Sequence, residues 1–322
     1  MTTIILRLAP MSILVFGTVA QAAEQYPART VRIIVATSPG ATADVAARLI
    51  SQPLAQRVGQ QVVVENRAGA ATMIGSDIVA KAPPDGYTLL MGGFALTTNP
   101  ALYLKIPYDA LHDFAPISLA ITTPMLLVVH PSLPAKSVKE LIALAKARPG
   151  DVAYASAGNG SGPHMAMELL LSLSGARMLH VPYKGPAVAI LDVLSGRVSV
   201  IITTPLTGGP HVRAGRFRAL GVTGSARAAS IPDVPTIVES GLPRYEALQW
   251  AGLLAPARIP QEIITRLHNE VAAILNAPEV MQRVLKEDGA VAANSPVEFA
   301  AFMRSESAKW ASVARSAGIK PE

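Results

Sequence analysis

Strand and helix patterns alternate along the first part of the chain. A β-branched run over residues 31–36 is followed by a loop and by an alanine-rich stretch, residues 43–57, whose apolar positions have helical spacing. A second strand pattern (61–65), a second helix pattern (72–81) and a third strand pattern (87–91) follow in turn. This β-α-β-α-β order is typical of a parallel sheet with helices packed on it. Pro53 lies inside the first helix pattern, so we expect a kink or a break there.

A second alternating block begins near residue 125. Its strand patterns cover residues 125–130, 151–156, 179–182, 198–203 and 218–222, and its helix patterns cover 138–147, 164–172 and 187–195. A short strand (253–255) and two helical segments (260–277 and 296–317) end the chain. The fold class is therefore α/β, with two units. Because ligands bind beyond the carboxyl ends of parallel strands, two facing units predict a cleft between domains.

Composition narrows the class of protein. The chain has 322 residues, enough for two domains, and its 50 % hydrophobic and 16 % charged residues exclude an intrinsically disordered chain. The formal charge of +6 is scattered, without a basic stripe, so we expect no nucleic-acid partner. The absence of cysteine excludes disulfides, thiolate metal sites and a cysteine nucleophile.

The N-terminus has the pattern of a secretory signal peptide. Arg7 precedes a short apolar segment, residues 11–19, and Ala20-Gln21-Ala22 places small residues at the −3 and −1 positions of a cleavage site. The apolar run is well short of the ~20 residues that a membrane span needs. We therefore expect residues 1–22 to be removed and the mature chain to be secreted and soluble.

Three strand-to-helix corners share a design suited to anions. They are residues 37–42, 67–72 and 157–163, and each leads into a helix whose first N–H groups lack partners. Thr42, Thr72 and Ser161 add hydroxyl groups, and glycine lets a ligand approach the backbone closely. The segments 37–42, 69–72 and 156–163 contain no lysine or arginine, so backbone donors must hold most of a bound anion.

Enzymatic and metal-binding interpretations have weaker support. Ser161 lacks the G-x-S-x-G frame of a hydrolase, because Asn159 stands where the first glycine should be. His164 and Glu168 are four residues apart on one helix face, but two ligands make a poor zinc site, so we expect no metal and no cofactor. Asp44, one turn into a helix, could either stabilise the helix start or bind an amine of a ligand.

Taken in order, several motifs resemble a known family. They include "YPARTVRIIVATSPGATADVAAR", "VVVENRAGAATMIGSDIVAKAPPDGYTLLMG", "SAGNGSGPHMAMELL", "HVPYKGPAVAILDVLSGRV" and "WAGLLAPARIP". The chain resembles, over nearly all of its mature length, the extracytoplasmic substrate-binding receptors of tripartite tricarboxylate transporters, the Bug family. The resemblance implies a two-domain type II periplasmic binding-protein fold, with residues 23–124 and 251–322 in domain 1 and residues 125–250 in domain 2.

The resemblance also implies a function. It points to a monomeric periplasmic receptor, not an enzyme, that captures a small carboxylate and passes it to membrane subunits of the transporter through transient contact. The alternatives are a ligand-sensing module for a sensor kinase and a secreted serine hydrolase using Ser161. The residues expected to bind the ligand are Ser38, Gly40, Ala41, Thr42, Asp44, Gly69, Ala70, Thr72, Gly93, Phe94, Ala157, Gly158, Ser161, His164, Thr203 and Thr204.

The chain departs from the family pattern at positions that bear on the ligand. The first loop reads Ser38-Pro39-Gly40-Ala41 where the family usually has Pro-Pro-Gly-Gly, and Thr203 stands where an aspartate is common. A neutral hydroxyl in place of a carboxylate removes a partner for a ligand amine. We therefore expect plain carboxylates rather than amino acids as ligands.

Overall fold

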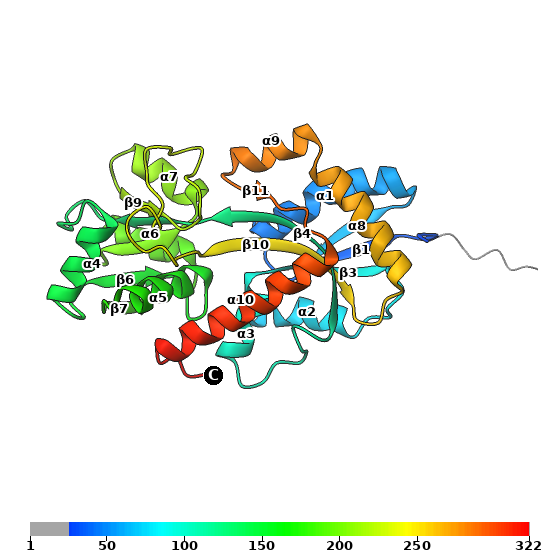
Figure 1. The fold of residues 1–322 in the computed structure, drawn as a ribbon, viewed down its shortest axis with the longest axis horizontal. Coiled ribbons are helices and arrows are strands. Elements are labelled where there is room, and N and C mark those ends of the chain that lie inside the picture. The colour runs from blue at the N-terminus through cyan, green and yellow to red at the C-terminus, as the bar shows by residue number, and fades with distance from the viewer. Residues whose placement is uncertain (1–25, 322) are drawn as a thin grey trace, which may run out of the picture.

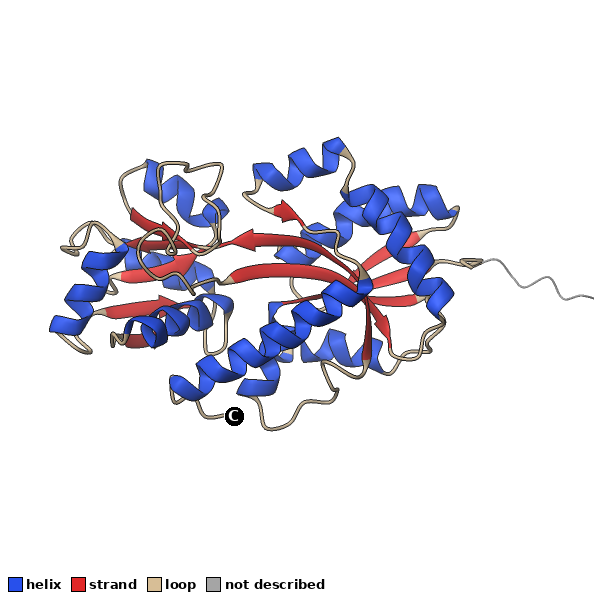
Figure 2. Cartoon of the chain, viewed as in Figure 1, coloured by secondary structure: helices blue, strands red, loops and turns tan. Residues whose placement is uncertain are grey.

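The computed structural model describes residues 26–321 of the chain. Two lobes, each built on one β-sheet with helices on both faces, lie side by side (Figures 1 and 2). We call the lobe with the six-stranded sheet the first lobe and the lobe with the five-stranded sheet the second lobe. The expected signal peptide and its cleavage site lie outside the described residues.

The first lobe has the strand order β11-β4-β10-β3-β1-β2. Strand β1 pairs in parallel with β2 and β3, whereas β10 runs antiparallel to β3 and β4. The strands are β1 (Val31–Val35), β2 (Val62–Asn66), β3 (Thr88–Gly93), β4 (Phe114–Pro124), β10 (Leu248–Pro256) and β11 (Ala290–Val291). The helices are α1 (Thr42–Val58), α2 (Met73–Ala80), α3 (Phe94–Leu102), α8 (Gln261–Leu275), α9 (Pro278–Lys286) and α10 (Pro296–Ser316), with a 3-10 turn, η1 (Ala70–Thr72), before α2.

Alternation of side chains along β1 explains how helices cover both faces of this sheet. Ile33 and Val35 are fully buried in a core shared with α1 and α8, whereas Ile34 points into a core shared with α2, α3 and α10. Helix α8 presents Leu267 and Val271 to the sheet, as its spacing predicts.

The second lobe has the strand order β7-β6-β8-β5-β9. Strand β6 pairs in parallel with β7 and β8, and β5 runs antiparallel to β8 and β9. The strands are β5 (Leu126–Val129), β6 (Ala153–Ser156), β7 (Leu179–Pro182), β8 (Val200–Thr203) and β9 (Arg218–Val222), and the helices are α4 (Val138–Ala147), α5 (Gly162–Ser174), α6 (Pro186–Leu194) and α7 (Pro205–Arg213).

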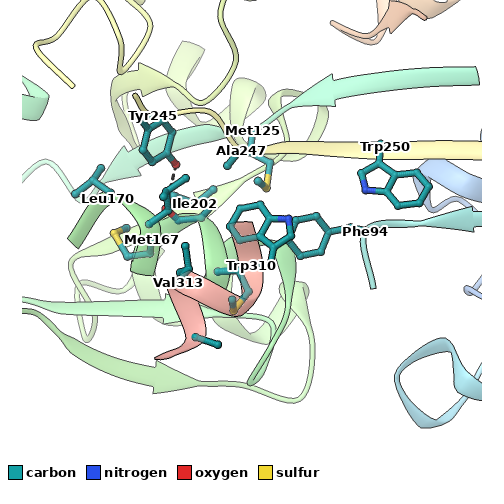
Figure 3. Packing of buried hydrophobic residues seen from close by; sticks show 14 of the residues in the cluster. Phe94, Met125, Met167, Leu170, Ile202, Tyr245, Ala247, Trp250, Trp310 and Val313 are labelled. Atoms are coloured by element: carbon teal, nitrogen blue, oxygen red, sulfur yellow. Dashed lines mark hydrogen bonds between the residues drawn. The ribbon is translucent and has the colours of Figure 1, made fainter. Parts of the chain in front are cut away.

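Two strands and one helix connect the lobes. Only Met125 separates β4 of the first lobe from β5 of the second, and the chain returns through β10 (Figure 1). Helix α10 starts on the first lobe and ends beside α5 of the second, where the hydroxyls of Ser316 and Ser172 lie 3.1 Å apart. Trp310 of α10 packs against Phe94 with ring centroids 4.9 Å apart, in a core that also holds second-lobe side chains (Figure 3).

Several expectations from the sequence need correction. Helix α1 passes through Pro53 without a break. The strand expected at 253–255 is the nine-residue β10, and it is antiparallel, so neither sheet is wholly parallel. The sequence patterns missed β4, β11, α3, α7 and α9. Helix α7 reads PLTGGPHVR and therefore has little intrinsic helix preference.

Among residues 26–321, no helix combines the length and the apolar character that crossing a membrane requires.

Candidate ligand-binding cleft

A cavity of about 760 Å³ lies between the two lobes. Its walls include residues at the carboxyl ends of β1 and β3 in the first lobe and of β6 and β8 in the second. In each sheet the winding reverses at this point, because β1 lies between β2 and β3, and β6 lies between β7 and β8. Ligands of α/β proteins bind at such switch points, so this cavity is the candidate ligand site.

Helices α1, α3, α5 and α7 all begin at the cavity, but they do not offer equal numbers of donors. Pro163 and Pro205 remove one N–H group each from the first turns of α5 and α7, and Thr204 Oγ1 accepts from the Thr207 N–H (3.2 Å). No side chain caps α1, α3 or α5, and α1 and α3, with Ala41 and Gly93 as N-cap residues, also have no proline in the first turn. The first lobe therefore presents the stronger anion site, formed by backbone N–H groups at two helix starts.

The corner before α1 is held in place by a buried carboxylate. Asp44 is 3 % exposed and accepts hydrogen bonds from the N–H of Gly40 (2.9 Å), from Arg48 (3.1 Å) and from Asn66 (2.9 Å). Burial alone would raise the pKa of Asp44, but these hydrogen bonds outweigh it and lower the pKa below its usual value. Asp44 therefore supports the loop from within.

Some backbone N–H groups at the corner before α1 are already used in hydrogen bonds, and the others are free to bind a ligand. The Gly40 N–H is used by Asp44, and the Ala41 N–H donates to Ser38 O (3.3 Å). The first helical bond of α1 runs from Val45 N–H to Ala41 O (3.0 Å). The N–H groups of Thr42, Ala43 and Asp44 precede it and have no partner within the helix.

The second corner adopts a backbone conformation that is costly for alanine. Ala70, Ala71 and Thr72 have φ angles of 44°, 49° and 74°, in the left-handed region that favours glycine. The buried amide of Asn99 donates to Ala71 O (2.8 Å) and so holds this backbone in place. Of the three residues, only Thr72 lines the cavity.

The second-lobe side of the cavity supplies hydroxyl groups. Ser161, Thr203, Thr204 and Thr207 line it, together with apolar side chains such as Ile202. Charged side chains are nearly absent from the wall: among the described residues that line the cavity, only Glu287 is ionisable at neutral pH. A ligand in this cavity would contact helix N-termini, hydroxyl groups and apolar side chains.

The structure brings together ten of the sixteen residues expected at the site. Those lining the cavity are Gly40, Ala41, Thr42, Thr72, Gly93, Phe94, Ala157, Ser161, Thr203 and Thr204. Those outside its lining are Ser38, Asp44, Gly69, Ala70, Gly158 and His164. Lining residues outside the sixteen expected ones include Thr37, Ser76, Thr123, Gln249 and Trp250. Thr123 and Gln249 lie on β4 and β10, the strands whose extent the sequence patterns did not reveal.

The hydrolase and metal interpretations gain no support from the geometry. The Ser161 hydroxyl donates to the Gly158 carbonyl (2.8 Å). The serine that contacts a histidine in this region is Ser156, which is bonded to His180 but is fully buried. His164 Nε2 lies 4.0 Å from Glu168 Oε1, and no cluster of three candidate metal ligands occurs within residues 26–321.

The fold is that of two-domain periplasmic binding proteins. Residues 46–319 match the family described as the tripartite tricarboxylate transporter family receptor, and the chain belongs to that family. It is a solute-binding receptor, as the resemblance implied.

Individual relatives agree with this assignment. The chain is 37 % identical to Protein BugT of Bordetella pertussis, over 92 % of each chain. The structure of R. palustris Rpa4515 with adipate has a TM-score of 0.80 and 35 % identity, covering 92 % of this chain and 100 % of that one. The structure of MatC from Rhodopseudomonas palustris with bound malate has a TM-score of 0.75 and 30 % identity, covering 89 % and 99 %.

Proposed function

We propose that this protein captures a small organic carboxylate in the cleft and delivers it to the membrane subunits of a transporter. One observation carries the proposal: the uncapped starts of α1 and α3 meet at a cavity whose wall holds no cationic side chain among the described lining residues. Such an arrangement binds an anion through backbone N–H groups and the helix dipoles. Adipate and malate, the ligands named for two structural neighbours, are both carboxylates.

The rest of the wall suits the remainder of such a ligand. Met91, Phe94, Ile121 and Ile202 provide apolar surface for a hydrocarbon body, and the second-lobe hydroxyls can bond a distant polar group. Each hydrogen bond to a charged group is worth roughly 1.5–3 kcal/mol. Two or three of them, with burial of the hydrocarbon, are enough for micromolar affinity, about −8 kcal/mol.

The finer parts of the proposal rest on the family and on the way the two lobes are joined. The receptor acts in the periplasm as a monomer, performs no catalysis, and closes its two domains on the ligand by bending at residues 123–126 and 249–253. The crossing of β4 and β10 between the lobes supports this position for the hinge. Thr203 at the end of β8 favours carboxylates that lack an amine.

Mass spectrometry of the natively purified protein, before and after denaturation, tests the proposal. We expect a released small molecule that carries at least one carboxylate. Calorimetric titration of ligand-free protein with adipate, hexanediol and hexamethylenediamine then compares six-carbon ligands that differ in charge, and malate is titrated as a shorter carboxylate. Binding of a carboxylate with no response to the diol or the diamine supports the proposal. Release of a cationic or neutral molecule, or binding of the diamine alone, contradicts it.

A further inference from the structure

Two histidine rings stack behind the loop that the second lobe contributes to the cavity. His164 of α5 and His180 of β7 lie with ring centroids 4.0 Å apart and planes 9° from parallel. The ring of Tyr154, on β6, continues the stack at 4.8 Å from His180. His164 is 4 % exposed and Tyr154 is fully buried. None of these rings lines the cavity between the two lobes, which we call the main cavity.

Each imidazole bonds a different part of the loop formed by residues 156–161. His164 Nδ1 accepts the N–H of Gly160 (3.0 Å). His180 Nε2 is bonded to Ser156 Oγ (2.6 Å), and the same hydroxyl oxygen accepts the N–H of Gly158 (3.2 Å). Gly158 and Gly160 have φ angles of 121° and 72°, so the loop takes a shape that few residues adopt without support.

The loop is also the wall between two cavities. Gly160 lines both the main cavity and a second cavity of about 310 Å³, and this second cavity is lined by His164 and His180. Residues 157, 160 and 161 face the main cavity. A change in the loop's hydrogen bonds would therefore move groups that line the ligand site.

The hydrogen bond to Gly160 requires neutral His164, because Nδ1 acts as an acceptor. Burial and the neighbouring His180 lower the pKa of His164 to about 3, and burial lowers the pKa of His180 to about 4. The other titratable groups near the rings are Glu168, which accepts the Tyr154 hydroxyl, and Tyr103 and Lys320 in the second cavity. Burial raises the pKa of Glu168, so the carboxyl stabilises a charged ring less than an exposed carboxylate would.

We propose that His164 and His180 are positioning residues for the ligand: the two rings hold the loop 156–161 in its ligand-binding shape, and protonation of His164, which removes the acceptor of the Gly160 N–H, loosens it. This inference rests on the proposed function, because it assumes that the ligand occupies the main cavity. Since both rings are neutral in the folded state, the stability that they contribute is complete above about pH 6.5 and decreases as the pH falls toward the lowered pKa values.

Paired substitutions separate a positioning role from simple packing. His164→Phe keeps a flat ring in the stack but has no acceptor, whereas His164→Asn places an amide oxygen near the position of Nδ1 and cannot be protonated. A positioning role predicts that His164→Phe weakens adipate binding about threefold to tenfold, the worth of one hydrogen bond. It also predicts that His164→Asn binds within about twofold of the wild type, because the bond to Gly160 is restored. If the ring of His164 matters only for packing, His164→Phe should bind adipate more tightly than His164→Asn.

Hydrogen exchange of the Gly160 amide gives a readout that needs no ligand. We expect this amide to be protected in the wild type and in His164→Asn and to exchange at least tenfold faster in His164→Phe. As the pH falls from 7 to 4, protection after correction for intrinsic exchange should decrease in the wild type but not in His164→Asn. Equal protection in all three proteins, or better binding by His164→Phe than by His164→Asn, would overturn the inference.

Two further outcomes are distinguishable. If the wild type binds neither adipate nor malate while Gly160 follows the expected exchange pattern, the failure lies in the proposed ligands and the positioning of the loop stands. If His164→Phe does not fold, the pair His180→Phe and His180→Gln makes the same comparison at Ser156.

Discussion

The carboxylate of Asp288 joins the two lobes by accepting two hydrogen bonds from Ser230. The Ser230 N–H lies 2.7 Å from Oδ1, and the hydroxyl lies 2.5 Å from Oδ2. Ile231 packs in a core of the second lobe and Val284 in a core of the first, so the contact spans both. Glu287, next to Asp288, lines the cavity. The pair therefore fastens the lobes at the edge of the ligand site.

Loss of the Ser230 hydroxyl should favour the open form. In Ser230→Ala, one hydrogen bond to a charged group is lost, which should shift the equilibrium between closed and open lobes about tenfold toward open. We expect a larger radius of gyration in X-ray scattering and faster ligand release. Ser240→Ala is the matched control, because the Ser240 hydroxyl bonds Thr236 O within the second lobe. Scattering and release rates equal to those of the wild type would show that the contact does not hold the lobes together.

Asp44 should contribute to stability in a pH-dependent way. Its pKa is lowered in the folded protein, so its contribution is complete above the unfolded value of about 3.9 and is lost as the pH falls through the lower folded value. Asp44→Asn should reduce the free energy of unfolding by about 1–3 kcal/mol at pH 7. The difference from the wild type should shrink at pH 3, as measured by urea denaturation.

A control for this measurement is Asp77→Asn, which removes the partly exposed ion pair between Asp77 of α2 and Lys81, the residue after that helix. It should cost less than about 1 kcal/mol. If Asp44→Asn were as stable as the wild type at pH 7, the carboxylate would not be what holds the corner before α1.

Ala71 should be a site where glycine stabilises the protein. Its φ and ψ angles of 49° and 44° lie in the left-handed region, which costs an alanine roughly 1–2 kcal/mol. Ala71→Gly should relieve this strain and raise the free energy of unfolding by about 0.5–1 kcal/mol, although glycine loses more entropy on folding. The same change in the exposed part of a helix, Ala273→Gly in α8, should lower it by about 1 kcal/mol. If Ala71→Gly destabilised the protein as Ala273→Gly does, the backbone at Ala71 would not be strained.

Local patterns in the sequence were enough to place the strand-to-helix corners. The β-branched run of β1 and the helical spacing of α1 depend only on neighbouring residues, and both elements lie within a residue or two of their expected bounds. The residue patterns also predicted two α/β units, and the resemblance added the type of periplasmic binding-protein fold that these units form.

Contacts between distant segments could not be predicted in the same way. Strand β10 reads LQWAGLLAP, with polar Gln249 near its start, and it forms its full length because it pairs with β4 and β3. The role of Asp44 stayed open because its partner Asn66 comes from β2. The part played by His180 depends on Ser156, which lies on the neighbouring strand β6.

Substitution of Ala41, the N-cap of α1, tests the central claim that the ligand's acid group is held at this helix start. An aspartate at an N-cap accepts hydrogen bonds from the first-turn N–H groups, so it suits the helix while it occupies the donors that the ligand needs. Ala41→Asp should keep the free energy of unfolding near the wild-type value. Ala41→Asn caps the helix without adding charge and is the matched control.

The decisive measurement is isothermal titration of three proteins: the wild type, Ala41→Asn and Ala41→Asp. All three are titrated with the same carboxylate, which is either adipate or the molecule that co-purifies. We predict about tenfold weaker binding by Ala41→Asn and at least about a hundredfold weaker binding by Ala41→Asp, through lost hydrogen bonds and like-charge repulsion. If folded Ala41→Asp binds the carboxylate as tightly as the wild type, the acid group does not lie at the start of α1 and the central claim is wrong.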